Sequence, residues 1–112
     1  MPYPVPQTRI QSGAAGVLRS VICPPGAVTA VAAARVNRSN IILQNNEATA
    51  AQLAYVGFLP GVTAADGLVL DFGPAAGRPG AALSMDTQDA VFVWNPGPLL
   101  LDLRVAELRA TP

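Results

Sequence analysis

The sequence predicts an all-β protein, an antiparallel β-sandwich or barrel of jelly-roll-like type with seven to eight short strands. Three observations support this fold class. Short apolar segments rich in valine, leucine and isoleucine recur at a spacing of roughly ten residues. Proline, glycine and asparagine separate these segments and supply turn chemistry between them. The chain has 112 residues, which is enough for one domain with a single core and short for two.

The first residues differ in composition from the rest, and we expect residues 1–16 to form an extended arm before a β-sandwich domain of residues 17–112. Proline at three alternating positions favours extended backbone and removes hydrogen-bond donors: Pro2, Pro4 and Pro6. Two interpretations stay open, a frayed terminus and an arm that becomes ordered against a neighbouring subunit. The second interpretation uses three apolar side chains of the arm as contacts: Tyr3, Val5 and Ile10.

Two strands are expected before the middle of the chain. Val17–Cys23 has strand composition, and the Pro-Pro-Gly segment that follows it ends the strand sharply. Val28–Val36 is ambiguous, because its alanines favour a short helix and its valines favour a strand. The segment is short for a helix, so the strand is preferred.

The chain is expected to be organised around residues 37–58, which predict a strand, a tight turn and a second strand. The first strand, Ile41–Gln44, begins with the apolar, β-branched-rich run Ile41-Ile42-Leu43. Asn45-Asn46 follows as a turn, because asparagine tolerates the left-handed backbone and bonds its own main chain. Leu53–Phe58 then resumes strand character. We expect these two strands to form the central pair of the fold.

Four further strands are expected, at Leu68–Phe72, Ala81–Met85, Ala90–Trp94 and Leu99–Leu108. The Asp-Gly pair before the first of them is a hairpin signal. The last has the cleanest alternation in the chain, with one face apolar from Leu99 through Val105. A helix is the competing interpretation there, but no N-cap residue precedes the segment and the period of two favours a strand.

Charge is scarce in this sequence, and its distribution excludes several classes of partner. Charged residues make up 12% of the chain, against roughly 25% in an average soluble domain, and the net charge is zero. Either an alanine-rich composition bias or a surface largely covered by partner protein explains this. All seven basic residues are arginines spread along the chain, which argues against a nucleic-acid-binding face. No apolar run approaches the ~20 residues of a membrane span, and no secretory signal is expected.

The sequence offers little for catalysis, and we expect neither enzymatic activity nor a cofactor. Histidine is absent, which removes the commonest general base and the commonest zinc ligand. The single cysteine, Cys23, lies in an apolar run and is expected to be a small core residue rather than a reactive thiol. Asp86 and Asp89 are close enough in sequence to be compared with a glycosidase carboxylate pair, but a polar turn explains them better.

The aromatic side chains allow two interpretations. Each lies in an apolar, strand-like segment, so core positions are preferred over a ligand-binding platform. The residues concerned are Tyr55, Phe58, Phe72, Phe92 and Trp94.

Several segments, taken in order, resemble a known group of proteins. They are the Arg38–Asn46 strand ending in Gln-Asn-Asn, the Tyr-Val-Gly-Phe element at 55–58, the Thr63–Leu70 turn and strand, Ala90–Trp94, and Leu103–Glu107. Over roughly residues 36–108 the chain resembles small β-sandwich virion proteins of tailed bacteriophages, of the head decoration, cement or fibre-base type.

This resemblance implies a capsid decoration protein on the virion surface that binds the major capsid protein, is a homotrimer, and stabilises the head shell. The alternative is a fibre-base, tail or receptor-binding β module of the virion. In that case the loops at 73–80 and 95–98 would carry recognition, with Arg78 and Asn95 as candidate residues. A carbohydrate-active enzyme is the least favoured hypothesis.

Overall fold

Eight β-strands make up the computed structural model, which describes residues 16–47, 52–73 and 80–109. No helix occurs in these ranges. The strands are β1 (Gly16–Cys23), β2 (Ala27–Ala32), β3 (Arg38–Asn45), β4 (Ala54–Gly57), β5 (Leu68–Leu70), β6 (Ala82–Met85), β7 (Val91–Asn95) and β8 (Leu101–Arg109). The segment Val28–Val36, which was ambiguous between helix and strand, forms the strand β2 as far as Ala32 and continues as a loop.

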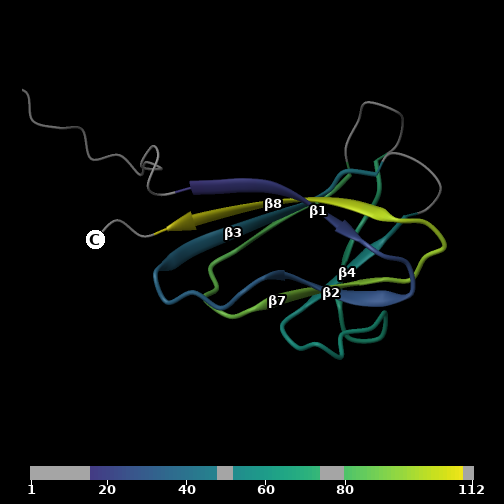
Figure 1. The fold of residues 1–112 in the computed structure, drawn as a ribbon, viewed down its shortest axis with the longest axis horizontal. Helices are drawn as coiled ribbons and strands as arrows, with labels where there is room; N and C mark the ends of the chain where they lie inside the picture. Colours follow the sequence, from purple (N-terminus) through teal and green to yellow (C-terminus); the bar gives the residue numbers. More distant parts are fainter. Residues whose placement is uncertain (1–15, 48–51, 74–79, 110–112) are drawn as a thin grey trace, which may run out of the picture.

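The strands form two four-stranded antiparallel sheets that face each other (Figure 1). The order is β1-β8-β3-β6 in the first sheet and β2-β7-β4-β5 in the second. The chain changes sheet at every connection except β4–β5, so strands that are neighbours in sequence mostly face each other across the core. This is the strand order of a jelly roll, and the predicted β-sandwich is confirmed.

The predicted central pair is wrong. Ile41–Gln44 lies within β3 in the first sheet, whereas Leu53–Phe58 contains β4 in the second sheet. Asn45 belongs to β3 rather than to a tight turn, and its buried side-chain amide donates to the carbonyl oxygens of Gln52 and Leu70, at 2.7 and 3.0 Å. The connection from 46 to 53 therefore crosses between sheets, which a two-residue hairpin turn cannot do.

The core between the sheets follows from the period of two in each strand. In β8 the predicted alternation is confirmed from Leu101 to Val105, while Leu99 lies in the preceding loop and is exposed. Cys23 is fully buried, as predicted. The buried cluster is almost entirely aliphatic: Cys23, Val31, Ala32, Ile41, Leu43, Ala54, Val56, Leu70, Val91, Val93, Leu101, Leu103 and Val105.

The aromatic side chains do not form the core, contrary to prediction. In β7 the inward positions belong to Val91, Val93 and Asn95, so the period of two turns Phe92 and Trp94 to the outer face. Tyr55 pairs with Trp94 in register on that same outer face, and both are half-buried. The spacing of about 10 Å between packed sheets is filled by the smaller aliphatic residues.

The Asp-Gly pair lies in a hairpin connection, as predicted, but this connection is longer than a two-residue turn. β4 and β5 pair as an antiparallel hairpin, and the connection between them runs from 58 to 67. The backbone N–H of Thr63 donates to the Asp66 carboxylate at 2.8 Å, and the N–H of Gly67 donates to the Thr63 carbonyl at 2.9 Å. Asp66-Gly67 thus closes a longer loop that leads into β5.

Candidate functional site

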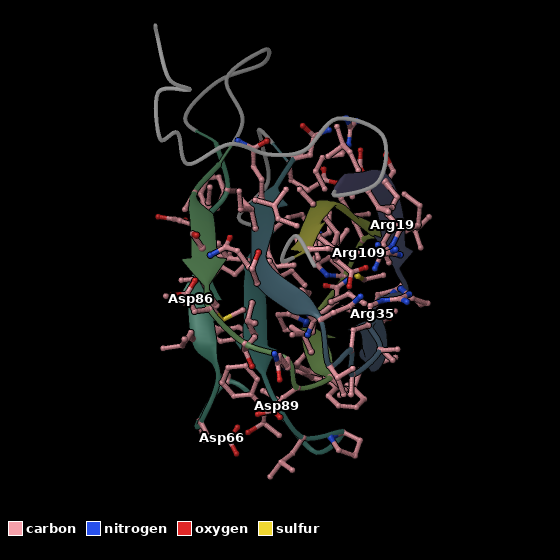
Figure 2. All side chains as sticks on the ribbon, turned by 90° about the vertical axis from the view of Figure 1, so that its left-hand side faces the viewer. Arg19, Arg35, Asp66, Asp86, Asp89 and Arg109 are labelled. Atoms are coloured by element: carbon pink, nitrogen blue, oxygen red, sulfur yellow. The ribbon has the colours of Figure 1, made fainter. Side chains whose placement is uncertain are left out.

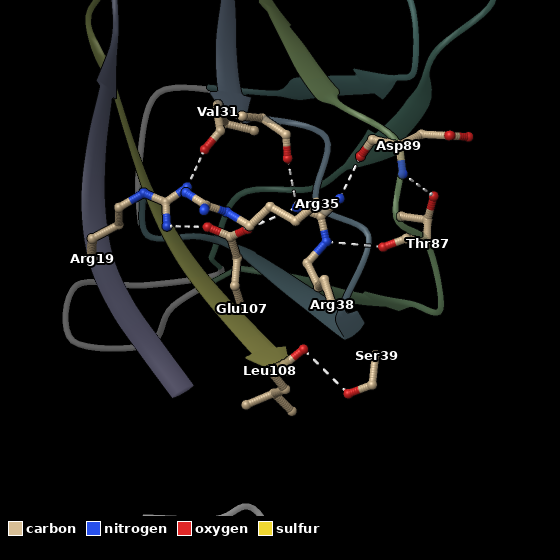
Figure 3. Close-up of polar contacts among 10 residues, drawn as sticks. Arg19, Val31, Arg35, Arg38, Ser39, Thr87, Asp89, Glu107 and Leu108 are labelled. Atoms are coloured by element: carbon tan, nitrogen blue, oxygen red, sulfur yellow. Dashed lines mark hydrogen bonds and ion pairs between the residues drawn. The ribbon is translucent and has the colours of Figure 1, made fainter. Parts of the chain in front are cut away.

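The two ends of the sandwich carry different polar chemistry. One end contains the loops 33–37, 58–67 and 86–90, together with the start of β1 and the end of β8. We call it the arginine end, because Arg19, Arg35, Arg38 and Arg109 lie there (Figures 2 and 3). The opposite end contains the loops 24–26 and 96–100 and the described residues 46–47, 52–53, 71–73 and 80–81 of the two other connections.

A single buried carboxylate organises the arginine end. The Glu107 side chain, on β8, is 4% exposed and accepts from three guanidinium groups (Figure 3). Arg19 Nη1 reaches Oε2 at 2.5 Å, Arg38 Nη1 reaches Oε1 at 2.7 Å, and Arg35 Nε reaches Oε1 at 3.2 Å. Three cations around one anion leave this cluster with a net positive charge.

Arg38 connects the elements that meet at this end. Its side chain is 0% exposed. Besides Glu107, it donates to the carbonyl oxygens of Ala33 and Thr87, both at 2.9 Å, and to that of Asp89. One planar guanidinium therefore joins the β2–β3 loop, the β6–β7 loop and β8, using the fixed fork of donors that only arginine has.

The electrostatics of Glu107 agree with a structural role. Burial alone would raise the pKa of this carboxyl, but the hydrogen bonds from Arg38 and Arg19 and the positive charges of Arg19 and Arg35 outweigh burial and lower the pKa. Glu107 therefore stays ionised and held, and it is not poised to exchange a proton near neutral pH. The cluster fixes the geometry of this end of the fold.

Sequence reasoning missed this cluster, although the signal was present. The alternation through Leu101, Leu103 and Val105 places Glu107 at the next inward position of the same strand. A carboxylate at an inward position must have a partner, because an unpaired buried charge is very costly. In β1, Val17 pairs with Glu107, and Arg19 lies two residues further along. The period of two therefore gives Arg19 an inward position as well.

The two aspartates compared with a glycosidase pair lie in the exposed β6–β7 loop. Asp86 accepts from the side-chain amide of Asn40 at 2.8 Å, and Asp89 holds Arg38 through its backbone carbonyl. They line a shallow depression with Arg38, Ser39, Thr87 and Gln88. This arrangement agrees with the polar-turn interpretation. Among the described residues, no three side chains of the metal-binding types gather into one site.

At the opposite end, buried amides hold the loops. Asn95 was predicted as a recognition residue, but its side chain is 0% exposed. Its amide donates to the carbonyl oxygens of Cys23 and Leu99 at 2.9 and 2.8 Å, and its side-chain oxygen accepts from the N–H of Gly97. Asn95 is therefore a structural residue whose side chain is unavailable to a partner. Arg78, the other predicted recognition residue, lies outside the described residues.

The described part of the surface carries exposed apolar side chains in several places. Ten large hydrophobic residues are exposed in the described ranges. They fall mainly on the β1 edge, on the β4–β5 hairpin and at the opposite end: Val17, Leu18, Ile22, Val36, Phe58, Leu59, Leu68, Val69, Leu99 and Leu100. A small cavity of about 220 Å³ lies in the hairpin, lined by residues that include Phe58, Leu59 and Leu68.

The β1 strand is the longest of the four edge strands. It pairs with β8 over eight residues without a bulge, whereas β2 is irregular between Ala30 and Ala32 and β5 has only three residues. Its free edge carries no proline, and Leu18 and Ile22 are exposed on its outer face. An edge of this kind presents unpaired backbone groups that a further strand can bind. The arm residues Tyr3, Val5 and Ile10 precede this strand and lie outside the described residues.

Comparisons with known proteins identify a fold and no family. No protein family matches the sequence, and no curated protein matches it. Among solved structures the chain is similar to CapF, crystallised with the inhibitor 3-isopropenyl-tropolone, with a TM-score of 0.51 and 8% identity over 91% of this chain. The chain spans only 27% of the length of CapF.

A second similar structure comes from Bacillus endospore appendages, which form a novel family of disulfide-linked pili. The TM-score is 0.46, with 13% identity over 96% of this chain and 100% of the other. At such identities the likeness to CapF concerns the fold alone, and the weaker second match carries no argument. The likeness to phage virion proteins therefore rests on sequence segments and stays a prediction. No helix in the described part of the chain is long and apolar enough to cross a membrane.

Proposed function

We propose that this protein is a structural subunit of a many-copy protein assembly, and specifically a capsid decoration protein of a tailed bacteriophage. In this role it binds the major capsid protein, associates with itself as a homotrimer on the capsid surface, and stabilises the shell by covering surface. It binds no nucleic acid or membrane and catalyses no reaction. The assignment to a phage head comes from the sequence resemblance, and the structure supplies the physical support for a subunit that works through contacts.

The observation that carries the proposal is the exposed apolar surface. Ten large hydrophobic side chains are exposed among the described residues alone, and only 12% of the chain's residues are charged. A solitary soluble domain keeps large apolar patches and uncharged surfaces to a minimum, because both promote association. In an obligate assembly, interfaces of roughly 2,000 Å² or more are rather apolar and cover such residues.

The strand edges lead to the same conclusion. The free edge of β1 is long and regular and carries exposed apolar side chains at Leu18 and Ile22. Natural proteins protect such edges with charges, prolines or bulges, or cover them with another chain. The first three devices are absent from β1 apart from Arg19, whose side chain turns inward to Glu107. In the proposed assembly a neighbouring subunit covers this edge.

The test is occupancy on particles. Purified protein is added to isolated shells of the phage that encodes it, and bound copies are counted by quantitative mass spectrometry and seen in a density map. A decoration protein reaches hundreds of copies per head, and a protein that does not bind shells contradicts the proposal. A variant lacking residues 1–13 tests the arm, because it leaves β1 intact. Unchanged occupancy of this variant would refute a contact role for Tyr3, Val5 and Ile10.

A fibre-base, tail or receptor-binding module is the second candidate. The exposed side chains of Leu99 and Leu100, on the loop between β7 and β8, favour it as an apolar contact point at one end of the molecule. Copy number separates the two candidates, because a tail module is present in a few copies per particle. A few copies confined to the tail would favour this second assignment.

A further inference from the structure

Charges at the arginine end are separated by sign. Figure 2 looks onto this end and shows Arg19, Arg35 and Arg109 together on one side. Asp86 and Asp66 lie toward the other side of the same view, and Asp89 lies near its lower middle. All three aspartates are exposed, as are Arg35 and Arg109, while Arg19 is half-buried. We call these two sets the basic flank and the acidic flank.

The sheet topology explains the separation. Arg19 lies on β1 and Asp86 directly follows β6, and these two strands are the opposite edges of the first sheet. Three strand spacings separate them, or about 14 Å. β1 and β2, the edge strands of the two sheets on one side, face each other across the core. The edge strands on the other side are therefore β6 and β5. Asp66 lies just before β5. Arg19 therefore lies on the opposite side of the sandwich from Asp66 and Asp86. Arg109, on the inner strand β8, and Asp89, which precedes the inner strand β7, lie nearer the middle of this end.

Each flank also carries exposed apolar side chains. Leu18 and Ile22 lie on the β1 edge, and Leu68 and Val69 lie on the β5 edge. Burial of these residues would supply affinity, since apolar contact provides about 25 cal/mol per Å² removed from water. Charges at the rim contribute mainly orientation and selection of the partner.

We propose that copies of this chain pack side by side, with the basic flank of one copy against the acidic flank of the next. A two-fold contact between like flanks that set the two arginine ends side by side would bring arginines against arginines or aspartates against aspartates, which is repulsive. A contact between unlike flanks is heterologous, so it closes into a ring, as a trimer requires, or continues as a row. The inference rests on the proposed function, because it names the contact through which the many copies associate.

A charge swap tests this contact. Self-association is measured by sedimentation velocity at low ionic strength, where the Debye length is ~30 Å and the flank charges act over a longer range. Arg109→Glu on the basic flank and Asp89→Arg on the acidic flank are each expected to weaken the dissociation constant by about tenfold or more. Neither side chain makes a hydrogen bond or ion pair to another described residue, so the fold does not depend on them. The chain that carries both changes is expected to recover to within about threefold of the wild type.

Two matched controls separate this contact from a general charge effect. Arg104→Glu changes an arginine on the same strand as Arg109, in the middle of the first sheet and away from both flanks. Asp71→Arg changes an exposed aspartate at the opposite end of the sandwich. Each is expected to change the dissociation constant by less than about twofold.

Several results would overturn the inference. They are a wild type that stays monomeric at high concentration, flank variants that behave like the controls, or a double variant no better than its parents. Shell occupancy is measured separately on the same proteins. If the wild type binds shells but the flank substitutions do not change its self-association constant, this contact is refuted and the proposed function is unaffected. If self-association depends on the flank charges but the protein does not bind shells, the proposed function is refuted and the contact is supported.

Discussion

Replacement of Arg38 by methionine should destabilise the fold severely, because this one side chain serves four acceptors at the arginine end. The change removes a fully buried guanidinium and keeps a side chain of similar length. The carbonyl oxygens of Ala33, Thr87 and Asp89 each lose a donor, and Glu107 loses its most buried partner. Glu107 still retains Arg19 and Arg35.

The magnitude follows from these losses. Breaking a buried ion pair from one side costs about 3–5 kcal/mol, and a buried carbonyl left without its donor costs about 1–3 kcal/mol. The four contacts belong to one network, so these costs do not add. We expect a loss of about 4 kcal/mol, a large part of the roughly 5–15 kcal/mol by which domains are stable.

Urea unfolding at neutral pH, followed by the fluorescence of Trp94, measures this loss as a lower midpoint at unchanged slope. Arg35→Met is the matched control, because the Arg35 side chain is 45% exposed and makes a single contact of 3.2 Å to Glu107. Its expected cost is below about 1 kcal/mol. Arg38→Lys keeps the charge without the fork and should fall between them. An Arg38→Met protein within about 1 kcal/mol of the Arg35→Met protein would refute the network reasoning.

Three further predictions concern acid stability, a close backbone approach and a buried amide. The pKa of Glu107 is lower in the folded state than the ordinary 4.5, so its contribution to the free energy of unfolding is present above that pH and is lost as the pH falls through the folded value. Glu107→Gln should therefore flatten the acid side of a plot of unfolding free energy against pH. An unchanged acid side would contradict the assignment. Gly80→Ala places a Cβ 2.1 Å from the Asp71 carbonyl oxygen, whereas the Cβ of Gly61→Ala meets nothing within 4 Å. Calorimetry should therefore show a melting temperature lowered by about 10 °C or more for Gly80→Ala and not for Gly61→Ala. Asn95→Ala should cost about 2–3 kcal/mol in urea unfolding, because two carbonyls lose their donor, and a cost under half of that would show that water replaces the amide.

Local patterns predicted most of the elements. The alternation from Leu101 to Val105, the β-branched run at Ile41 and the burial of Cys23 are all present in the structure. These features depend on the period of two and on the chemistry of single residues, both of which can be read from neighbouring positions in the chain. The same rule, carried two residues further along β8, would also have identified Glu107 as buried.

Pairing was not predictable in the same way. Ile41–Gln44 and Leu53–Phe58 were recognised as strands, yet they lie in different sheets, because a strand has one apolar face and that face fits equally well against a neighbour in the sheet or across the core. The choice depends on all eight strands together. The outward orientation of Phe92 and Trp94 has the same origin, since composition marks a residue as apolar but does not say which side of the strand faces the core.

By itself, the sequence determined an all-β domain with few charges and no histidine. Only the tertiary structure decided where those few charges lie. Arg19, Arg38 and Glu107 are separated by up to 88 positions in the chain and meet because β1, β3 and β8 are neighbours in one sheet. The basic and acidic flanks arise in the same way, since the strand order places β1 and β6 at opposite edges. Strand order is a property of the whole chain, because it reflects which arrangement buries every apolar face at once.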